Sequence, residues 1–289
     1  MALSDGSVLL VEIFAGTLTR VSPNGAKTIV ARPGGGPNGA AIGPDGKCCI
    51  CNNGGFRWHV EGAQRRPILQ ADDYGGGRIE RIDLATGAVE CLYRAAGAIP
   101  LKGPNDLVFD AQGGFYFSDL GKVRTREMDR GAVYYAKADG SFIAEVAFPM
   151  VTPNGVGLSP DEKILYVAET EPGRLWGFDI VEPGVVRKEP WPSPHGGRLI
   201  AGVGGYQRFD SLALDAEGRI CVATLVNGGI TVISPDGRHV EHHPMPDLMT
   251  TNICFGGRDL KTAFVTLSWT GRLVAVDWPV PGLKLNHSE

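Results

Sequence analysis

The sequence predicts an all-β protein, a six-bladed β-propeller with four-stranded blades in which the first blade is incomplete at the N-terminus. Two kinds of short strand segment recur along the chain, and no long segment has the period of an α-helix. The 41 Gly and 20 Pro residues indicate many tight turns. Repeats spaced by roughly 40–50 residues are typical of propeller blades, so residues 1–289 are expected to form a single propeller domain.

The first repeated segment begins with glycine, continues with apolar residues in alternation and ends at a polar turn. Alternating apolar residues between turn signals indicate a β-strand that is buried on one face. Successive copies begin roughly 42 to 61 residues apart, which is compatible with one copy per blade when loops vary in length. The copies begin at Gly16, Gly77, Gly131, Gly173, Gly229 and Gly271.

The second repeated unit is a short hairpin, clearest between Gly103 and Asp119. A polar residue precedes a short strand, a turn follows, and a second strand ends on another polar residue. Because a hairpin brings its two ends together, we expect Asn105 and Asp119 to lie at the same edge of the blade. Five copies place a polar residue seven positions before the turn: Asn38, Asn105, Asn154, Asp210 and Asn252.

These polar residues are expected to converge on one mouth of the central tunnel. The inner strand of a propeller blade starts at one rim of the channel, and the second strand returns to that rim. A single Pro-Asn or Asn-Gly is usually only a turn, but recurrence in register favours a common site. The returning strands end in three carboxylates, which should line the same mouth: Glu12, Asp119 and Glu169. The side chains expected to contact a substrate are Glu12, Asn38, Asp119, Glu169 and Asn252.

Composition narrows the class of partner. The net charge of −4, without a clustered basic face, argues against nucleic acid or an anionic membrane. The chain has no apolar run long enough for a membrane span and no signal-peptide pattern. We therefore expect a cytoplasmic protein whose partner is a small molecule, and the sequence does not predict the oligomeric state.

Several familiar site motifs are absent or broken. The glycine pattern of residues 34–39 contains Pro37 and is not followed by a helix, so it does not predict a dinucleotide site. Neither G-x-S-x-G nor H-E-x-x-H occurs, and the six cysteines lack zinc-ligand spacing, so buried free thiols are expected.

Three segments between the repeats are long. Residues 56–76 and 121–130 leave the mouth side of a strand, where they either select the substrate or only cover the rim. Residues 187–208 are expected to contain an outer strand.

Four motifs resemble the SMP-30/gluconolactonase/LRE-like family, and the resemblance covers nearly the whole chain. They are Pro-Asn-Asp-Leu-Val-Phe-Asp at 104–110, Thr-Pro-Asn-Gly-Val-Gly-Leu-Ser-Pro-Asp at 152–161, Tyr-Val-Ala-Glu-Thr at 166–170 and Phe-Asp-Ser-Leu-Ala-Leu-Asp-Ala-Glu-Gly at 209–218. The resemblance implies a six-bladed propeller with one divalent cation in the tunnel mouth, and hydrolysis of sugar lactones. Matched by motif, Asn105, Asn154 and Asp210 are implied metal ligands, and Asp210 is also the implied acid/base.

The sequence departs from this family at its start. Members usually open with Glu-Gly-Pro, whose glutamate is a further metal ligand, whereas counting seven residues back from Asp5 falls before Met1. Three interpretations remain open: the start lies downstream of the natural one, the site uses fewer ligands, or Glu12 takes part of the role. We favour the first, and expect weakened metal binding in the chain as given.

The implied ligands suit a hard cation. Amide oxygens and a carboxylate favour Ca²⁺ or Mg²⁺, with Ca²⁺ the preferred assignment, although Zn²⁺ or Mn²⁺ can substitute. The expected function is hydrolysis of a sugar (aldono) lactone, with the metal polarising the carbonyl and Asp210 as general base. Two alternatives stay open: a phosphotriesterase-like or other ester hydrolase on the same metal site, and a non-enzymatic propeller that binds a protein partner.

Overall fold

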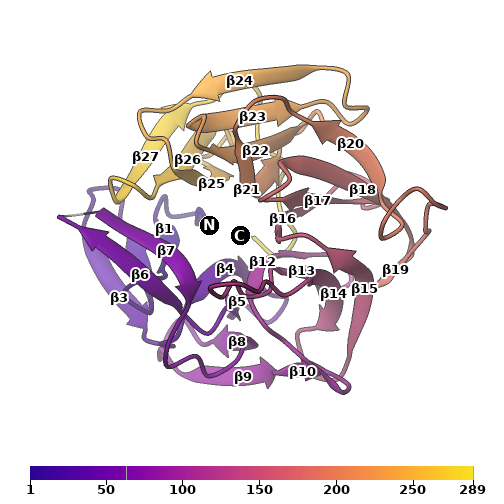
Figure 1. Cartoon of the computed structure of the whole chain (residues 1–289). Coiled ribbons are helices and arrows are strands. Elements are labelled where there is room, and N and C mark those ends of the chain that lie inside the picture. The colour runs from indigo at the N-terminus through magenta and orange to yellow at the C-terminus, as the bar shows by residue number, and fades with distance from the viewer. Residues whose placement is uncertain (63, 289) are drawn as a thin grey trace.

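The computed structural model describes residues 1–62 and 64–288, and all regular elements in this part of the chain are β-strands. Six sheets stand around a central channel like the blades of a propeller (Figure 1). The all-β class and the six-bladed arrangement predicted from the sequence are therefore confirmed. No helix long and apolar enough to cross a membrane occurs among the described residues.

Each blade is an antiparallel meander that runs outward from the channel. The first three blades are β1 (Val8–Glu12), β2 (Thr17–Val21) and β3 (Lys27–Ala31); β4 (Pro37–Ile42), β5 (Cys48–Asn52), β8 (Arg78–Ile82) and β9 (Val89–Tyr93); and β12 (Pro104–Phe109), β13 (Gly114–Asp119), β14 (Gly131–Lys137) and β15 (Ile143–Met150). The last three are β16 (Pro153–Leu158), β17 (Ile164–Glu169), β18 (Arg174–Glu182) and β20 (Arg198–Gly202), with β19 (Val185–Val186) beside β18; β21 (Arg208–Leu214), β22 (Ile220–Leu225), β23 (Gly229–Ile233) and β24 (Val240–Pro244); and β25 (Thr250–Gly256), β26 (Thr262–Leu267) and β27 (Arg272–Asp277). Two further pairs lie outside the blades: β6 (Phe56–Glu61) with β7 (Gln64–Gln70), and β10 (Ala95–Ala96) with β11 (Ile99–Pro100).

Both repeated units of the sequence correspond to defined strands. The glycine-led segments become β2, β8, β14, β18, β23 and β27, which are the third strand in blades 2 to 6 and the middle strand of the β1–β2–β3 sheet. The hairpins become the two strands nearest the channel. The outer strand expected within residues 187–208 is β20, which pairs with β18.

The first blade is incomplete, as predicted. Its sheet β1–β2–β3 has three strands, and the place of the inner strand is taken by Met1 and Ala2. The backbone of Met1 exchanges hydrogen bonds of 2.8 Å with Leu9 in both directions, and Ala2 bridges Val8. Only these two residues of an inner strand are therefore present in this blade.

The last blade also has three strands in the described part of the chain, which corrects the expectation that only the first would be short. After β27 the sequence continues with Trp278, Pro279 and Pro281. This segment adds no strand to the outer edge of β27, and Trp278 N donates instead to Lys261 O at 2.8 Å. The segment turns to the face of the ring opposite the site described below.

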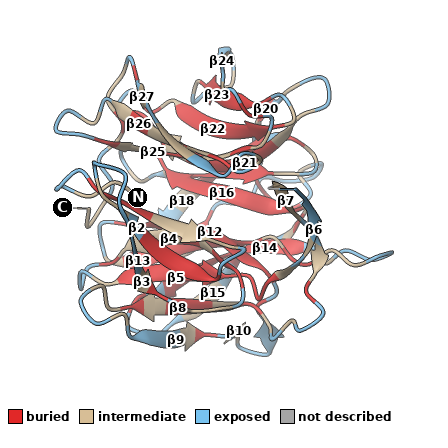
Figure 2. Ribbon diagram, turned by 90° about the vertical axis from the view of Figure 1, so that its left-hand side faces the viewer, coloured by how far each residue is buried: buried red, intermediate tan, exposed pale blue. Residues whose placement is uncertain are grey.

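The C-terminal segment crosses that opposite face from one side of the ring to the other. Gly282 N donates to Leu260 O in blade 6 (2.8 Å), and Leu283 N donates to Leu214 O in blade 5 (2.9 Å). Further along, His287 Nε2 lies 3.1 Å from Asp110 O in blade 3. Figure 1 places this end of the chain in the middle of the ring, and Figure 2 shows it on the side away from β6 and β7.

The core lies between neighbouring blades. Strands β12, β13, β16 and β22 are buried or nearly so at every position, because each inner strand has a blade on both sides (Figure 2). Phe115, Phe117 and Tyr134 of blade 3, for example, pack against Ile79 of blade 2. The outermost strands β3, β9 and β24 are largely exposed. Such close packing fixes where each inner strand presents its first residues.

The segment 56–76, expected to be a long loop, contains the hairpin β6–β7. It follows the end of β5 and lies over blade 1, with its tip pointing toward the outer edge of the ring (Figure 1). The Arg66 guanidinium lies 3.5 Å from the centroid of the Trp269 ring in blade 6, and the Arg65 guanidinium lies over Phe14 in blade 1. The hairpin thus connects blades 2, 1 and 6 where the ring lacks an inner strand.

Candidate functional site

A β-bulge occurs at the same place in five inner strands. The pairing register shifts between Pro104 and Leu107 in β12, between Pro153 and Val156 in β16, and between Phe209 and Leu212 in β21. Strands β4 and β25 shift at the equivalent position. A bulge breaks the regular alternation and re-aims a side chain. The bulged residues include the polar residues that the sequence repeat singled out: Asn38, Asn105, Asn154 and Asp210, with Asn252 at the edge of its bulge.

Two amide oxygens at this mouth are buried without a hydrogen-bond partner. Asn105 and Asn154 are 5% and 4% exposed, and the Oδ1 atom of each accepts no hydrogen bond from the described residues. The Asn154 amide is oriented by its Nδ2, which donates to Thr170 Oγ1 at 3.0 Å. A buried acceptor without a donor is costly, so each oxygen is suited to a group that the protein itself does not supply.

Two carboxyl groups lie close to these amides. Asp210 Oδ1 accepts from its neighbour Ser211 N (3.0 Å), and Asp106 Oδ1 accepts from Leu107 N (3.0 Å). Burial raises the pKa of Asp106 to about 7. Burial also raises the pKa of Asp210 to about 8, with the nearby Asp106 charge adding to the shift and the Asn154 amide opposing it. Asp210 is half-buried.

The carboxylates of Asp119 and Glu169 already accept hydrogen bonds from other groups of the protein. Asp119 accepts hydrogen bonds from the backbone of Lys102, Gly103 and Gly121 at 2.7, 2.6 and 2.9 Å. Glu169 accepts from Val151 N (2.6 Å) and Trp176 Nε1 (2.7 Å). Both therefore hold the turn that leads into an inner strand, a structural role that leaves them little capacity for a substrate.

Asn38, Asn252 and Glu12 lie at the rim and are only partly buried. Asn38 is beside the central group, because a Cβ placed on the next residue, Gly39, would be 2.5 Å from Asn105 O and 3.0 Å from Asp106 Oδ1. Asn252 lies in β25 opposite Thr266, and Glu12 ends β1. The structure therefore places the Asn154 amide and the Asp106 carboxyl beside Asp210, with Asn105 next to Asp106 in the chain. No contact within the described residues connects Glu12 or Asn252 to this group.

Two residues at the mouth were missed by the sequence reasoning. Asp106 stands next to Asn105 in the motif, but only the fold shows that its carboxyl approaches Asp210. Lys122 is 1% exposed, and its Nζ donates to Asn53 O (2.8 Å) and Gly55 O (2.7 Å) and lies 4.2 Å from the Phe56 ring centroid. Burial lowers the pKa of Lys122 to about 8, and the charges of Asp119 and Asp129 oppose this shift. A lone lysine in a variable loop gives no sequence signal of such a position.

The donor set fits a hard divalent cation. Asn105 and Asn154 each provide a free amide oxygen, and Asp210 provides a carboxylate. Oxygen donors of this kind suit Ca²⁺ or Mg²⁺ better than a metal that prefers thiolate or imidazole. Within residues 1–62 and 64–288, no cluster of three or more His, Cys, Asp or Glu side chains forms a metal site, so a site of mixed amides and a carboxylate is the arrangement that the mouth offers.

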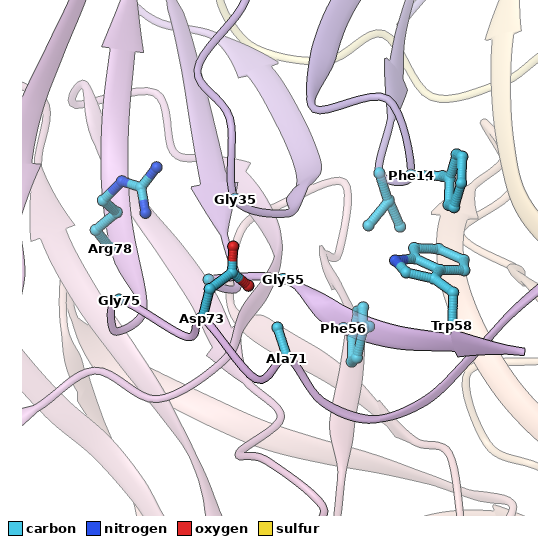
Figure 3. A pocket seen from close by; sticks show the side chains of 11 residues that line it. Phe14, Gly35, Gly55, Phe56, Trp58, Ala71, Asp73, Gly75 and Arg78 are labelled. Carbon is cyan, nitrogen blue, oxygen red and sulfur yellow. The ribbon is translucent and has the colours of Figure 1, made fainter.

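A cavity of about 270 Å³ lies beside the mouth, beneath the hairpin β6–β7 (Figure 3). Its walls include the rings of Phe14, Phe56 and Trp58 and the charged side chains of Asp73 and Arg78. A second cavity of about 570 Å³ opens among the turns of the opposite face, near Pro44, Gln112 and Tyr135. Neither cavity is lined by Asn105, Asn154 or Asp210.

Comparison with known proteins shows what this chain is similar to. The family model described as SMP-30/Gluconolactonase/LRE-like region matches residues 2–268. Lactonase drp35 from Staphylococcus saprophyticus is 30% identical over 244 residues, covering 84% of this chain and 67% of that protein. Its counterpart from Staphylococcus haemolyticus is 29% identical with the same coverage.

Solved structures share the fold at lower sequence identity. Regucalcin from Agrobacterium tumefaciens, described as a calcium-binding protein, has a TM-score of 0.77 at 20% identity and covers 100% of this chain and 92% of its own. A gluconolactonase from Xanthomonas campestris has a TM-score of 0.72 at 21% identity, covering 97% of this chain and 84% of its own. At these identities the likeness establishes the propeller fold.

Proposed function

The chain belongs to the SMP-30/gluconolactonase/LRE-like family, and on this premise we propose that it is a lactonase that opens a sugar (aldono) lactone at a divalent metal in the tunnel mouth. Its curated relatives carry the name lactonase, and its structural neighbours include a gluconolactonase and a calcium-binding regucalcin. The proposed substrate is a small, polar molecule, which suits a mouth built from amides and carboxylates.

The observation that carries the proposal is the pair of buried, unpartnered oxygens of Asn105 and Asn154 beside Asp210. These three residues would hold the metal, for which Ca²⁺ is the preferred assignment. The ion would polarise the lactone carbonyl and stabilise the charge that develops on its oxygen. Because the amide oxygens already point into the site without partners, binding does not require them to break existing hydrogen bonds.

Asp210 is the proposed general base. Its carboxylate takes a proton from a water molecule as the water oxygen forms a bond to the carbonyl carbon. The ring C–O bond then breaks, and the proton passes from Asp210 to the departing ring oxygen, which leaves a hydroxy acid. The neighbouring Ser211 N–H orients the base by donating to Oδ1. The Asp106 carboxyl lies close enough to influence the charge on Asp210.

The remaining polar residues divide into two groups. Asn38 lies next to the central group and is proposed to bind hydroxyl groups of the substrate, with Asn252 and Glu12 further out on the rim. Asp119 and Glu169 act indirectly in this proposal, because their carboxylates hold the backbone that precedes Asn105 and Asn154.

The test is a lactonase assay with glucono-δ-lactone, followed by acid release at constant pH and corrected for spontaneous hydrolysis. We expect turnover that is lost in EDTA, restored by Ca²⁺ or Mg²⁺, and reduced by about 10²-fold or more in Asp210→Asn. A panel of simple esters and a phosphotriester distinguishes the other hydrolase classes. Faster metal-dependent turnover of one of those, or no turnover of any, would overturn the assignment.

A further inference from the structure

The cavity beneath the hairpin β6–β7 is lined by none of the proposed metal ligands, and its lining comes from separate segments of the chain. Phe14 follows β1, Trp58 lies on the inserted hairpin, and Arg78 begins β8. Three separate segments therefore contribute one wall each. Phe14 is 54% exposed, so part of its ring remains available for contact.

The aromatic walls meet at right angles. The Trp58 ring lies 5.2 Å from Phe14 at an interplanar angle of 87°, and 6.1 Å from Phe56 at 86°. The rings are therefore perpendicular and form a right-angled corner instead of stacking on each other. Such a corner offers an apolar surface to a ring-shaped ligand while leaving the opposite side free.

The opposite side of the cavity is polar. In Figure 3, Asp73 and Arg78 lie on one side and Phe14 and Trp58 on the other. Arg78 is held in place, because its Nε donates to Glu80 Oε1 at 2.5 Å and its Nη2 donates to Pro33 O at 3.2 Å. Asp73 is exposed. The cavity thus presents apolar faces on one side and a hydrogen-bond donor and acceptor on the other.

This division matches the chemistry of a pyranose ring. One face of such a ring carries C–H groups that pack on an aromatic surface, and its edge carries hydroxyl groups that need donors and acceptors. The cavity volume of about 270 Å³ lies just below the range of about 300–1,000 Å³ that is usual for drug-sized ligands. A single sugar ring is therefore a suitable occupant.

A series of contacts through Lys122 and Asp119 links the wall of the cavity to the backbone that precedes Asn105. Lys122 Nζ binds Gly55 O, in the wall of the cavity, and its charge lies near Asp119. The Asp119 carboxylate in turn holds Gly103 N, two residues before Asn105. On the other side, Gly35 lines the cavity three residues before Asn38. The cavity therefore adjoins the part of the mouth formed by blades 2 and 3.

We propose that the cavity under the hairpin β6–β7 is a second sugar subsite, so that the preferred substrate is a glycosylated aldonolactone, a disaccharide with a lactone as its terminal unit. The inference rests on the proposed lactonase function. The lactone ring occupies the metal site, and the attached glycosyl ring packs against Trp58 and Phe14 with its hydroxyl groups on Asp73 and Arg78. Trp58 is accordingly a residue that determines specificity.

The test compares kcat/KM for glucono-δ-lactone and cellobiono-δ-lactone in the wild type and in Trp58→Ala. We expect the wild type to prefer the disaccharide lactone by about tenfold or more, and Trp58→Ala to lose this preference while its rate on the monosaccharide lactone stays within about twofold. Asp73→Asn, an exposed and nearly isosteric change, should lower the disaccharide rate in the same direction. Trp191→Ala is the matched control, because Trp191 is 89% exposed in the 187–197 loop and contributes nothing to the cavity.

Each other outcome is decisive. Equal kcat/KM for the two lactones in the wild type overturns the subsite while leaving the lactonase function intact, and so does an equal loss on both lactones in Trp58→Ala. If neither lactone is hydrolysed, the proposed function fails, and calorimetric titration with cellobionate then tests the cavity alone. In that case binding that weakens in Trp58→Ala supports the sugar subsite, and absence of binding overturns it.

Discussion

The backbone N–H of Gly103 donates a 2.6 Å hydrogen bond to the carboxylate of Asp119, at the other end of the same hairpin. The relationship recurs around the ring, since Gly36 N donates to Asn52 Oδ1 at 2.9 Å and Val151 N donates to Glu169 Oε1 at 2.6 Å. In each case the residue whose N–H donates this hydrogen bond lies two or three positions before the asparagine in the β-bulge. The end of the second strand therefore determines where the inner strand presents its polar side chain.

Asp119→Asn should lower stability, whereas Asp210→Asn should not. The Asp119 carboxylate accepts three backbone N–H groups, and an amide replaces a charged acceptor by a neutral one that also carries donors. We expect a loss of about 1–3 kcal/mol in the free energy of unfolding, measured by urea denaturation with EDTA present. Asp210 has no such set of partners, so equal losses in the two variants would contradict the division into structural and catalytic carboxylates.

Asn105→Leu should stabilise the metal-free protein and abolish its activity. The substitution keeps the number and branching of the side-chain heavy atoms and removes a buried oxygen that has no donor among the described residues. We expect the free energy of unfolding in EDTA to rise by about 1 kcal/mol, while lactone turnover is lost. Asn227→Leu, at an amide that donates to Gln207, is the control, and a less stable Asn105→Leu would show that the amide already has a partner.

Ca²⁺ should raise the unfolding free energy of the wild type and not that of Asn105→Leu. A ligand that binds only the folded state adds about 2.7 kcal/mol at one hundred times its dissociation constant. Thermal unfolding across a Ca²⁺ titration measures this effect without an activity assay. A shift of the same size in both proteins would place the ion elsewhere on the molecule.

Stability should fall between pH 6.5 and pH 4 because of His195. The ring is 6% exposed, lies 4.5 Å from the Trp176 ring, and has Lys188 as its charged neighbour. Burial, followed by the Lys188 charge, lowers the pKa of His195 to about 4. Between that value and the unfolded pKa of about 6.5, only the unfolded state takes up a proton, so stability is lost as the pH falls.

His195→Gln isolates this contribution. We expect the stability difference between pH 7 and pH 4.5 to shrink by about 1–2 kcal/mol in the variant, measured by urea denaturation at both pH values. His239→Gln, at an exposed histidine, is the matched control. An unchanged pH dependence in His195→Gln would show that His195 takes up its proton as readily in the folded protein as in the unfolded one.

The repeats of the sequence were sufficient to predict the fold, because each blade uses the same turn chemistry at the same spacing. The constant offset of seven residues placed Asn105, Asn154 and Asp210 at the same position of their inner strands, within or beside the register shifts of those strands, and their joint binding of a metal stays a prediction. The offset could not reveal the bulges, since a register shift depends on how neighbouring blades pack. For the same reason it could not tell that Asp119 and Glu169 have their oxygens occupied by backbone N–H groups.

The parts that escaped prediction are those set by contacts between distant segments. Residues 56–76 contain paired strands whose sequence, with Pro67 and several charged residues, lacks a clear alternation. The burial of Lys122 depends on carbonyls nearly 70 positions away in the chain. The short last blade was missed because strand content was inferred from the other copies.

The C-terminal segment that crosses the far face of the ring affects how a substrate would enter the channel and how a product would leave it. Because it runs from blade 6 to blade 3 across the far face, it lies over the end of the channel opposite the proposed metal site. The proposed lactone would then enter, and the hydroxy acid would leave, at the mouth that carries the amides. Release of the product therefore precedes entry of the next substrate, so the hydroxy acid should compete directly with the lactone for the site.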